Sequence, residues 1–321
     1  MQVFLTIDVE IWCNGWRDLD SVFPGSFDRY VYGASPHGNY ALPQVLSILN
    51  RHGLKAVFFV EPLFAARFGT HYLEIIVALI RNAGQEVQLH LHPEWTDESL
   101  VPILENCTKK RQHLSYYTLD EQTALIACGK KMLERAGSGP ISAFRSGSYA
   151  ANRDTFEALR HNDIFLDSSL NRCYAVSAPD LRGEHDFNSA FELHGVMTLP
   201  VTVLQDGFGN ERPAQVGACS FDEMRDALVS ACQAGRSSFV MVSHNFEMLR
   251  SGASTPDWFV VRRFENLCAF LADNSAHFDV RGFGSGMHFK QQDAVGMPLP
   301  SARWTSTARR LAEQTMRRLR H

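Results

Sequence analysis

Short apolar runs alternate with longer amphipathic runs along most of the chain. The apolar runs have the length and β-branched content of buried strands, and the amphipathic runs have the apolar spacing of helices. Such alternation predicts a parallel sheet with helices outside it, either open or closed into a barrel. The predicted strands are 3–8, 56–60, 86–91, 141–144, 164–167, 196–200, 238–243 and 278–282. The predicted helices are 42–52, 70–83, 119–136, 153–161, 221–234 and 258–274.

Long loops occur at only one end of the predicted strands. The helix-to-strand connections at 53–55 and 84–85 are short, whereas the strand-to-helix connections at about 10–40, 92–117 and 168–194 are long. This asymmetry is typical of a (β/α) barrel, which carries its functional site on loops at the carboxyl ends of its strands. We therefore predict one α/β barrel domain with elaborated strand-to-helix loops.

Bulk properties exclude several classes of protein. A chain of 321 residues can bury a large core, and its net charge of −4 argues against a nucleic-acid partner. The seven cysteines include no Cys-x-x-Cys pair, which indicates reduced thiols. Neither a signal peptide nor a membrane-spanning stretch is recognisable in the sequence, so we expect a cytoplasmic protein.

The last segment has a different composition. We divide the chain into a barrel domain at 1–295 and a proline-containing linker with a basic tail at 296–321. Residues 301–321 hold six arginines and one glutamate, and their apolar positions recur at helical spacing. Three placements are open for a docked amphipathic helix: the inner face of a membrane, the acidic body of the protein, or a partner. The alternative is a solvated, frayed tail.

Chemically useful side chains stand where the predicted strands end. Asp8 and Glu10 are two residues apart, so they share one face, and their like charges favour a nearby cation or a proton in transit. His90 and His92 share a face in the same way. Carboxylate and imidazole groups are suitable ligands for zinc and similar ions, so these residues predict a metal site.

Three further strand ends carry polar residues. Arg145 follows the strand at 141–144 and can hold a carboxylate by a forked hydrogen bond. Asp167 and His244 end two other strands, and we expect the carboxylate to orient the imidazole.

Taken in order, these segments resemble the polysaccharide deacetylase family, which is the NodB-homology group or carbohydrate esterase family 4. The first motif is of the acid-x-acid type, and the resemblance covers roughly residues 3 to 285. It implies a distorted (β/α)7-type, TIM-like barrel. It also implies a metal-dependent hydrolase that removes an acetyl group from an N-acetylated sugar. The matching segments are Asp8-Val9-Glu10, the second strand at 55–60, 84–90, Phe144-Arg145, Asp167-Ser168-Ser169 and Ser243-His244.

The resemblance also implies roles for single residues. Asp8 matches the general base that deprotonates the attacking water, and His244 matches the general acid that protonates the leaving amine. Glu10 and His90 match metal ligands. Arg145 matches the arginine that positions the base.

Other assignments concern tuning and substrate binding. By resemblance, Asp167 tunes the general acid, and Tyr149 lies near the position whose backbone N–H binds the oxyanion. Trp12, Trp16 and Trp95 are candidates for the substrate cleft, because aromatic rings suit the apolar faces of sugars. For each tryptophan, packing of the loops is the alternative.

The chain departs from the family pattern at the metal ligands. The family usually has a second histidine four residues after the first, where this chain has Glu94, while His92 stands two residues after His90. His92 and Glu94 are therefore both candidates for the third ligand. Glu10 is one methylene longer than the usual aspartate. We expect one divalent ion, zinc, and no organic cofactor.

The leading hypothesis is thus a cytoplasmic N-deacetylase that acts on a sugar of a glycan or a glycan precursor. A cytoplasmic location favours a lipid-linked or nucleotide-linked sugar over a mature polymer. The alternatives are a catalytically impaired sugar-binding or scaffold barrel, and another metal-dependent hydrolase of non-peptide C–N bonds. Carboxyl groups so near each other argue against glycoside cleavage.

Overall fold

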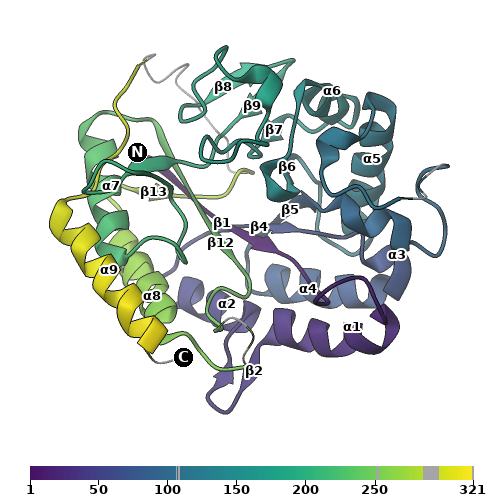
Figure 1. Ribbon diagram of the computed structural model, residues 1–321, viewed down its shortest axis with the longest axis horizontal. Helices are drawn as coiled ribbons and strands as arrows, with labels where there is room; N and C mark the ends of the chain where they lie inside the picture. The colour runs from purple at the N-terminus through teal and green to yellow at the C-terminus, as the bar shows by residue number, and fades with distance from the viewer. Residues whose placement is uncertain (106, 108, 251, 253, 285–295, 320–321) are drawn as a thin grey trace.

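The computed structural model describes residues 1–319 except 106, 108, 251, 253 and 285–295. A curled sheet lies at the centre, with strands in the order β12-β1-β4-β5-β6-β7-β9-β8 and β13 beside β1 (Figure 1). The neighbours pair in parallel except β8 and β9, which pair antiparallel. The strands of this sheet are β1 (Gln2–Val9), β4 (Val57–Val60), β5 (Glu86–Leu91), β6 (Ala143–Ser146), β7 (Leu166–Asp167), β8 (Phe191–Leu193), β9 (Val196–Thr198), β12 (Ser238–His244) and β13 (Asp279–Val280).

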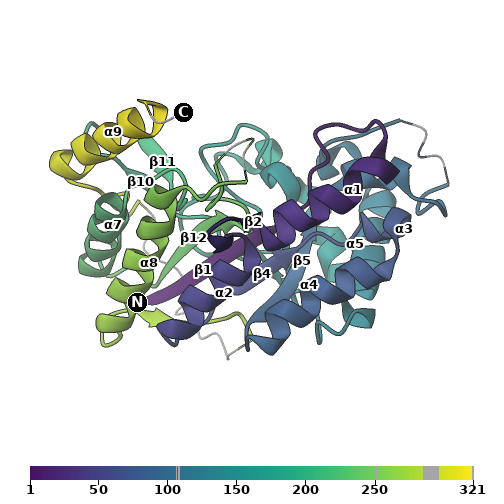
Figure 2. The same cartoon turned by 90° about the horizontal axis from the view of Figure 1, so that it is seen from below.

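Helices cover the outside of this sheet. Figure 2 shows α2 and α4 below β1, β4 and β5, and α7, α8 and α9 together at the left of the view. The helices are α1 (Leu19–Phe27), α2 (Leu42–Arg51), α3 (Ala65–Phe68), α4 (Thr70–Asn82), α5 (Leu119–Arg135), α6 (Arg153–His161), α7 (Phe221–Gln233), α8 (Trp258–Asp273) and α9 (Trp304–Leu319). The predicted distorted (β/α) barrel is therefore confirmed.

Burial on both faces explains why the strand sequences are apolar throughout. Along β1, Val3, Leu5 and Ile7 join the large core between the sheet and its helices, whereas Phe4 joins a smaller cluster inside the barrel. Asp8 follows Phe4 in the same two-residue alternation and is also buried. The alternation of β1 thus turns Asp8 towards the barrel interior.

Two short antiparallel pairs were not predicted. They are β2 (Ala34–Ser35) with β3 (Gly38–Asn39), and β10 (Val203–Gln205) with β11 (Glu211–Pro213). Segments flanking the β10–β11 hairpin lie beside β12, because Thr202 N–H donates to the Val240 carbonyl at 3.0 Å and Val242 N–H donates to the Ala214 carbonyl at 2.9 Å. This hairpin fills the gap between β9 and β12.

The basic C-terminal helix α9 docks on the body of the protein, which is one of the three placements left open by the sequence (Figure 1). Gly207 allows a close approach, since a Cβ there would lie 2.2 Å from the Trp304 Cα. The arginines of this segment form ion pairs with acids of the barrel. These pairs are Arg303–Asp226, Arg309–Asp222, Arg310–Asp206, Arg310–Glu223 and Arg317–Asp257. The predicted membrane contact gains no support from this arrangement.

None of the described helices is long and apolar enough to cross a membrane.

Candidate active site

A cavity of about 260 Å³ opens at the carboxyl ends of β1, β5, β6 and β12. Parallel strands bring their carboxyl ends to the same edge, so residues that are distant in sequence meet there. The cavity is lined by Asp8, Glu10, Trp12, His90, His92, Ser146, Ser148, Tyr149, Tyr174, Gln215 and His244.

Three of these residues form a candidate metal site. The Oε1 atom of Glu10 lies 2.9 Å from Nε2 of His90 and 3.0 Å from Nε2 of His92, and the donor atoms all lie within 4.8 Å of one another. All three side chains are buried. One carboxylate oxygen and two imidazole nitrogens are a donor set that fits zinc, so the residues present suit the expected ion.

The Nδ1 atom of each histidine has a hydrogen-bond partner on the side away from Glu10. Nδ1 of His90 donates to the Arg145 carbonyl at 2.8 Å, which leaves Nε2 to face Glu10. Nδ1 of His92 lies 3.3 Å from Oε2 of Glu94. Such partners fix the tautomer and orientation of a metal-binding imidazole. In this geometry Nε2 of His92 faces Glu10, and Glu94 contacts the other ring nitrogen of His92.

The charges of this cluster reinforce one another. Burial alone raises the pKa of Glu10, but His92 and His90 outweigh it and hold that pKa well below its usual range. Burial alone lowers the pKa of His92, but Glu10 and Glu94 outweigh it and hold that pKa well above its usual range. A buried carboxylate that stays charged is suited to a cation.

The candidate base Asp8 is held by a buried arginine. Nη1 of Arg145 donates to Oδ1 of Asp8 at 2.7 Å and to Oγ1 of Thr6 at 2.8 Å. Its Nε donates to the Ser168 carbonyl at 3.0 Å, and the guanidinium lies over the ring of Phe59. Because Arg145 is fully buried and bonded on several sides, it fixes the direction of the Asp8 carboxylate.

The candidate acid His244 has a different partner from the one expected. Its Nδ1 lies 3.0 Å from Oε1 of Glu247. Burial alone lowers the pKa of His244, but the bond to Glu247 and the charges of Glu10, Glu247 and Asp8 outweigh it and raise the pKa to about 9. A raised pKa favours the protonated imidazole, which can donate a proton.

The expected pairing of Asp167 with His244 is wrong. The Asp167 carboxylate instead accepts hydrogen bonds from the backbone N–H and the hydroxyl of Ser169, at 2.9 and 2.5 Å. Its strand ends beside β6, whereas His244 ends β12 and lies beside Asp8. Asp167 is thus engaged with its own loop, and Glu247 occupies the place beside the candidate acid.

Tyr149 lines the cavity as expected, on a strained turn. Ser148 and Tyr149 both have left-handed backbone angles, with φ of 54° and 58°. Each such non-glycine residue costs about 1–3 kcal/mol, and strain of this kind clusters at functional sites. The turn follows β6 directly, so it stands beside Arg145 at the cavity wall.

The tryptophans divide between cleft and core. Trp12 lines the cavity, whereas Trp95 is only 2% exposed and packs against Trp16 and Phe68. The prediction that Trp95 contacts the substrate is therefore wrong, because the turn after β5 directs it into the core. Trp16 packs under Lys110, whose Nζ lies 3.6 Å from the centre of its ring.

A second cavity of about 550 Å³ adjoins the first. The two share Trp12, His92 and Ser148 as lining residues. The second cavity is also lined by Trp16, Glu94, Lys110 and Gln112. Together the two cavities form a cleft that runs past the candidate metal ligands.

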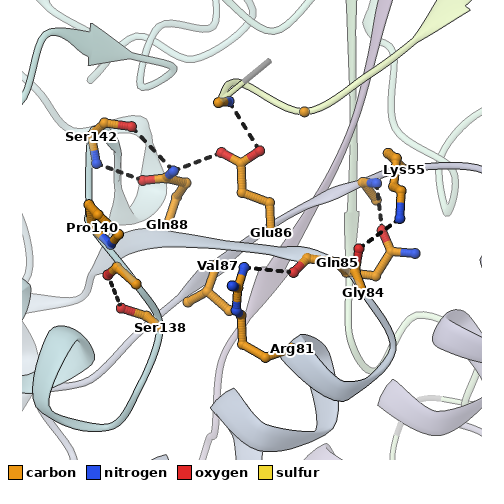
Figure 3. A pocket seen from close by; sticks show the side chains of 14 residues that line it. Lys55, Arg81, Gly84, Gln85, Glu86, Val87, Gln88, Ser138, Pro140 and Ser142 are labelled. Carbon is orange, nitrogen blue, oxygen red and sulfur yellow. Dashed lines mark hydrogen bonds between the residues drawn. The ribbon is translucent and has the colours of Figure 1, made fainter.

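A separate hollow of about 490 Å³ lies at the opposite end of the barrel, where β4, β5 and β6 begin (Figure 3). Its polar groups bind one another. The Gln88 side chain accepts from Ser142 N–H at 3.0 Å and donates to Glu86 at 2.7 Å, and Lys55 donates to the Gly84 carbonyl at 2.9 Å. These hydrogen bonds link residues where the strands begin, at the end of the barrel away from the candidate metal ligands.

Tyr174 and Gln215 of the cavity wall were missed in the sequence, and so were two residues that support the site, Glu247 and Asn245. Glu247 follows His244 by three residues in a turn, and its carboxylate also accepts from Gly217 N–H at 2.8 Å. Asn245 binds the backbone N–H and carbonyl of Glu10 at 3.1 and 3.2 Å. Both residues adjoin a strand-end histidine, and that proximity was the available signal.

One solved structure supports the fold. A protein from Mycobacterium smegmatis, solved as a candidate polysaccharide deacetylase, matches with a TM-score of 0.56 and 16% identity over 88% of this chain and 86% of that chain. The chain therefore shares the barrel fold of that structure, as its motifs predict.

Two other structures match with lower TM-scores. The family 4 carbohydrate esterase from Streptomyces lividans, in complex with acetate, has a TM-score of 0.42 and 13% identity over 86% of this chain and 90% of that chain. A CE4 family pseudoenzyme from Bacillus anthracis has a TM-score of 0.42 and 14% identity over 86% of this chain and 62% of that chain. No protein-family model and no curated protein matches the chain.

Proposed function

We propose that this chain is a metal-dependent N-deacetylase of the polysaccharide deacetylase family, acting on an N-acetylated sugar. One observation carries the proposal. A carboxylate held by Arg145 and an imidazole held by Glu247 line one cavity with a buried Glu10–His90–His92 donor set. Together these residues supply the base, the acid and the metal site that acyl transfer to water requires.

Each residue has a task that follows from its contacts. A divalent ion held by Glu10, His90 and His92 would polarise the amide carbonyl and activate water. Asp8, oriented by Arg145, accepts the proton of the attacking water. His244, protonated through its contact with Glu247, gives a proton to the departing amine.

The substrate proposal rests on the shape of the cleft and on the expected location. The smaller cavity accommodates an acetamido group beside the donor set, and the adjoining cavity beyond Trp12 has room for the rest of the substrate. A lipid-linked or nucleotide-linked sugar in the cytoplasm remains our proposal for that substrate.

The test is acetate release from N-acetylated sugars and chito-oligosaccharides with added Zn²⁺. We expect Asp8→Asn and His244→Ala each to lower kcat by about 10²–10⁴-fold, since each removes one proton-transfer group. The exposed Asp18→Asn is the matched control, and circular dichroism reports the fold. Full activity in both site variants would contradict the proposal.

The second candidate is a sugar-binding barrel without activity. The observation that favours it is the departure at the ligands, where Glu94 stands at the family's usual second histidine position. Wild-type protein that binds chito-oligosaccharide but neither takes up Zn²⁺ nor releases acetate would support this candidate over the enzyme.

A further inference from the structure

The two oxygens of Glu10 have different partners. Oε1 faces Nε2 of both His90 and His92, as described above. Oε2 accepts a hydrogen bond of 2.7 Å from the indole N–H of Trp12. Glu10 and Trp12 follow Asp8 at intervals of two residues, and all three side chains line the same cavity. One oxygen is thus reserved for the donor set and the other is occupied by the indole.

Trp12 also contacts a second member of the donor set. Its ring lies edge-on to the ring of His92, with the centroids 4.9 Å apart and the planes at 85°. Trp12 therefore touches two of the three candidate ligands, and it stands where the two cavities meet.

We propose that Trp12 is a positioning residue that makes Glu10 a ligand through one oxygen only; this inference rests on the proposed metal-dependent function. Glutamate has one more rotatable bond than aspartate, so its carboxylate has more orientations to lose when it binds an ion. The indole N–H removes that freedom, because it holds the carboxylate in one orientation before an ion binds. Coordination through one oxygen leaves a position open for substrate.

The test is Zn²⁺ affinity, measured by competition with a chromogenic chelator and without substrate. Trp12→Phe keeps an aromatic ring beside His92 but removes the N–H. We expect its affinity to be about 10–100-fold weaker, as for other partners of metal ligands. Trp16→Phe is the matched control, because Trp16 lines the adjoining cavity and packs on Trp95 and Lys110. Its affinity should stay within about twofold of wild type.

Cobalt substitution gives an independent signature. Visible absorption of bound Co²⁺ depends on coordination number, and binding through both Glu10 oxygens adds a ligand atom. We expect weaker visible bands in Trp12→Phe than in wild type or Trp16→Phe. Unchanged affinity together with an unchanged cobalt spectrum in folded Trp12→Phe would overturn the inference.

A double-mutant cycle separates positioning from packing. If Trp12 acts through Glu10, then Trp12→Phe should change Zn²⁺ affinity by less than about twofold in a Glu10→Ala background. An equal loss in both backgrounds would assign the effect to packing on His92 and overturn the inference. Wild-type protein that fails to bind Zn²⁺ would overturn the proposed function as well, so the two failures are distinguishable.

Discussion

The proton donor His244 is hydrogen-bonded to the carboxylate of Glu247. Glu247 lies 3.0 Å from His244 and contributes to a His244 pKa of about 9. A raised histidine pKa keeps the imidazole protonated below that value, and the proton is lost as the pH rises through it. Glu247→Gln should therefore move the alkaline limb of kcat/KM for acetate release from near pH 9 towards about 6.5, the ordinary histidine value. Glu211→Gln is the surface control. If the alkaline limb does not move in Glu247→Gln, then Glu247 does not raise the pKa of His244.

The third metal ligand is also decided at the scale of the residue. His92 Nε2 lies 3.0 Å from Glu10, whereas Glu94 reaches only the far nitrogen of His92. We expect Glu94→Gln to weaken Zn²⁺ binding by about 10–100-fold, because Glu94 acts through the imidazole, and His92→Ala to weaken it by more than that. Isothermal titration with Zn²⁺ measures both. The reverse order of severity would make Glu94 the ligand.

At the scale of elements, the turn Gly147–Tyr149 sets the position of His92. A Cβ at Gly147 would lie 2.7 Å from Nδ1 and Cε1 of the His92 ring, so one of them must shift. Gly147→Ala should lower Zn²⁺ affinity and lower kcat/KM by at least about tenfold, since misplacement of a functional group is costly. The control is Gly25→Ala, where a Cβ meets nothing within 4 Å. Equal kinetics in the two variants would show that the turn, and not the His92 ring, shifts to accommodate the added Cβ.

The principal strands were predictable because β-branched, doubly buried runs leave a strong periodic signal. The helix α1 was missed because Pro24 and Gly25 lie inside it and no side chain caps its start. The three-residue strands of the β10–β11 hairpin are too short for any periodicity to show. Elements that are defined by tertiary contacts leave little trace in local sequence.

The residues of the candidate site also divide into those that local sequence predicts and those that tertiary contacts define. Two-residue alternation places Asp8 with Glu10, and His90 with His92, without knowledge of the fold. The partners of these groups depend on loops and turns, which is why Asp167 was given the place of Glu247. Trp12 was predicted only as a candidate for the substrate cleft, because its bond to Glu10 depends on side-chain rotamers.

At the scale of the whole molecule, the acidic barrel and its basic last helix form one ion-pair network. Asp206 lies at the end of the β10–β11 hairpin, and Glu223 belongs to the first turn of α7, where it also completes a capping box with Ser220. Arg310 of α9 binds both acids. The helix thus fastens the hairpin that fills the gap beside β12 to the helix that follows it.

Substitution of Arg310 should destabilise the protein without changing the candidate active-site cavity. Arg310 is 5% exposed, and it donates to Glu223 at 2.9 Å and to Asp206 at 3.1 Å. Arg310→Met leaves two buried carboxylates without their cation, which costs about 3–5 kcal/mol in the free energy of unfolding. Arg318→Met is the control, because Arg318 is exposed and forms no ion pair with the described residues; we expect a change within about 0.5 kcal/mol.

The pH dependence gives this prediction its sign. Burial alone raises the pKa of Asp206, but hydrogen bonds from Asn210 and Phe208 and the charge of Arg310 outweigh it and hold the pKa below its ordinary value. A depressed carboxyl pKa stabilises the folded state above the unfolded-state pKa, and that contribution is lost as the pH falls through the folded-state value. The difference between Arg310→Met and wild type, measured by urea denaturation, should therefore be largest near neutral pH and should shrink below about pH 4. Equal stability at pH 7 would show that the ion pairs of Arg310 do not contribute to the stability of the folded protein.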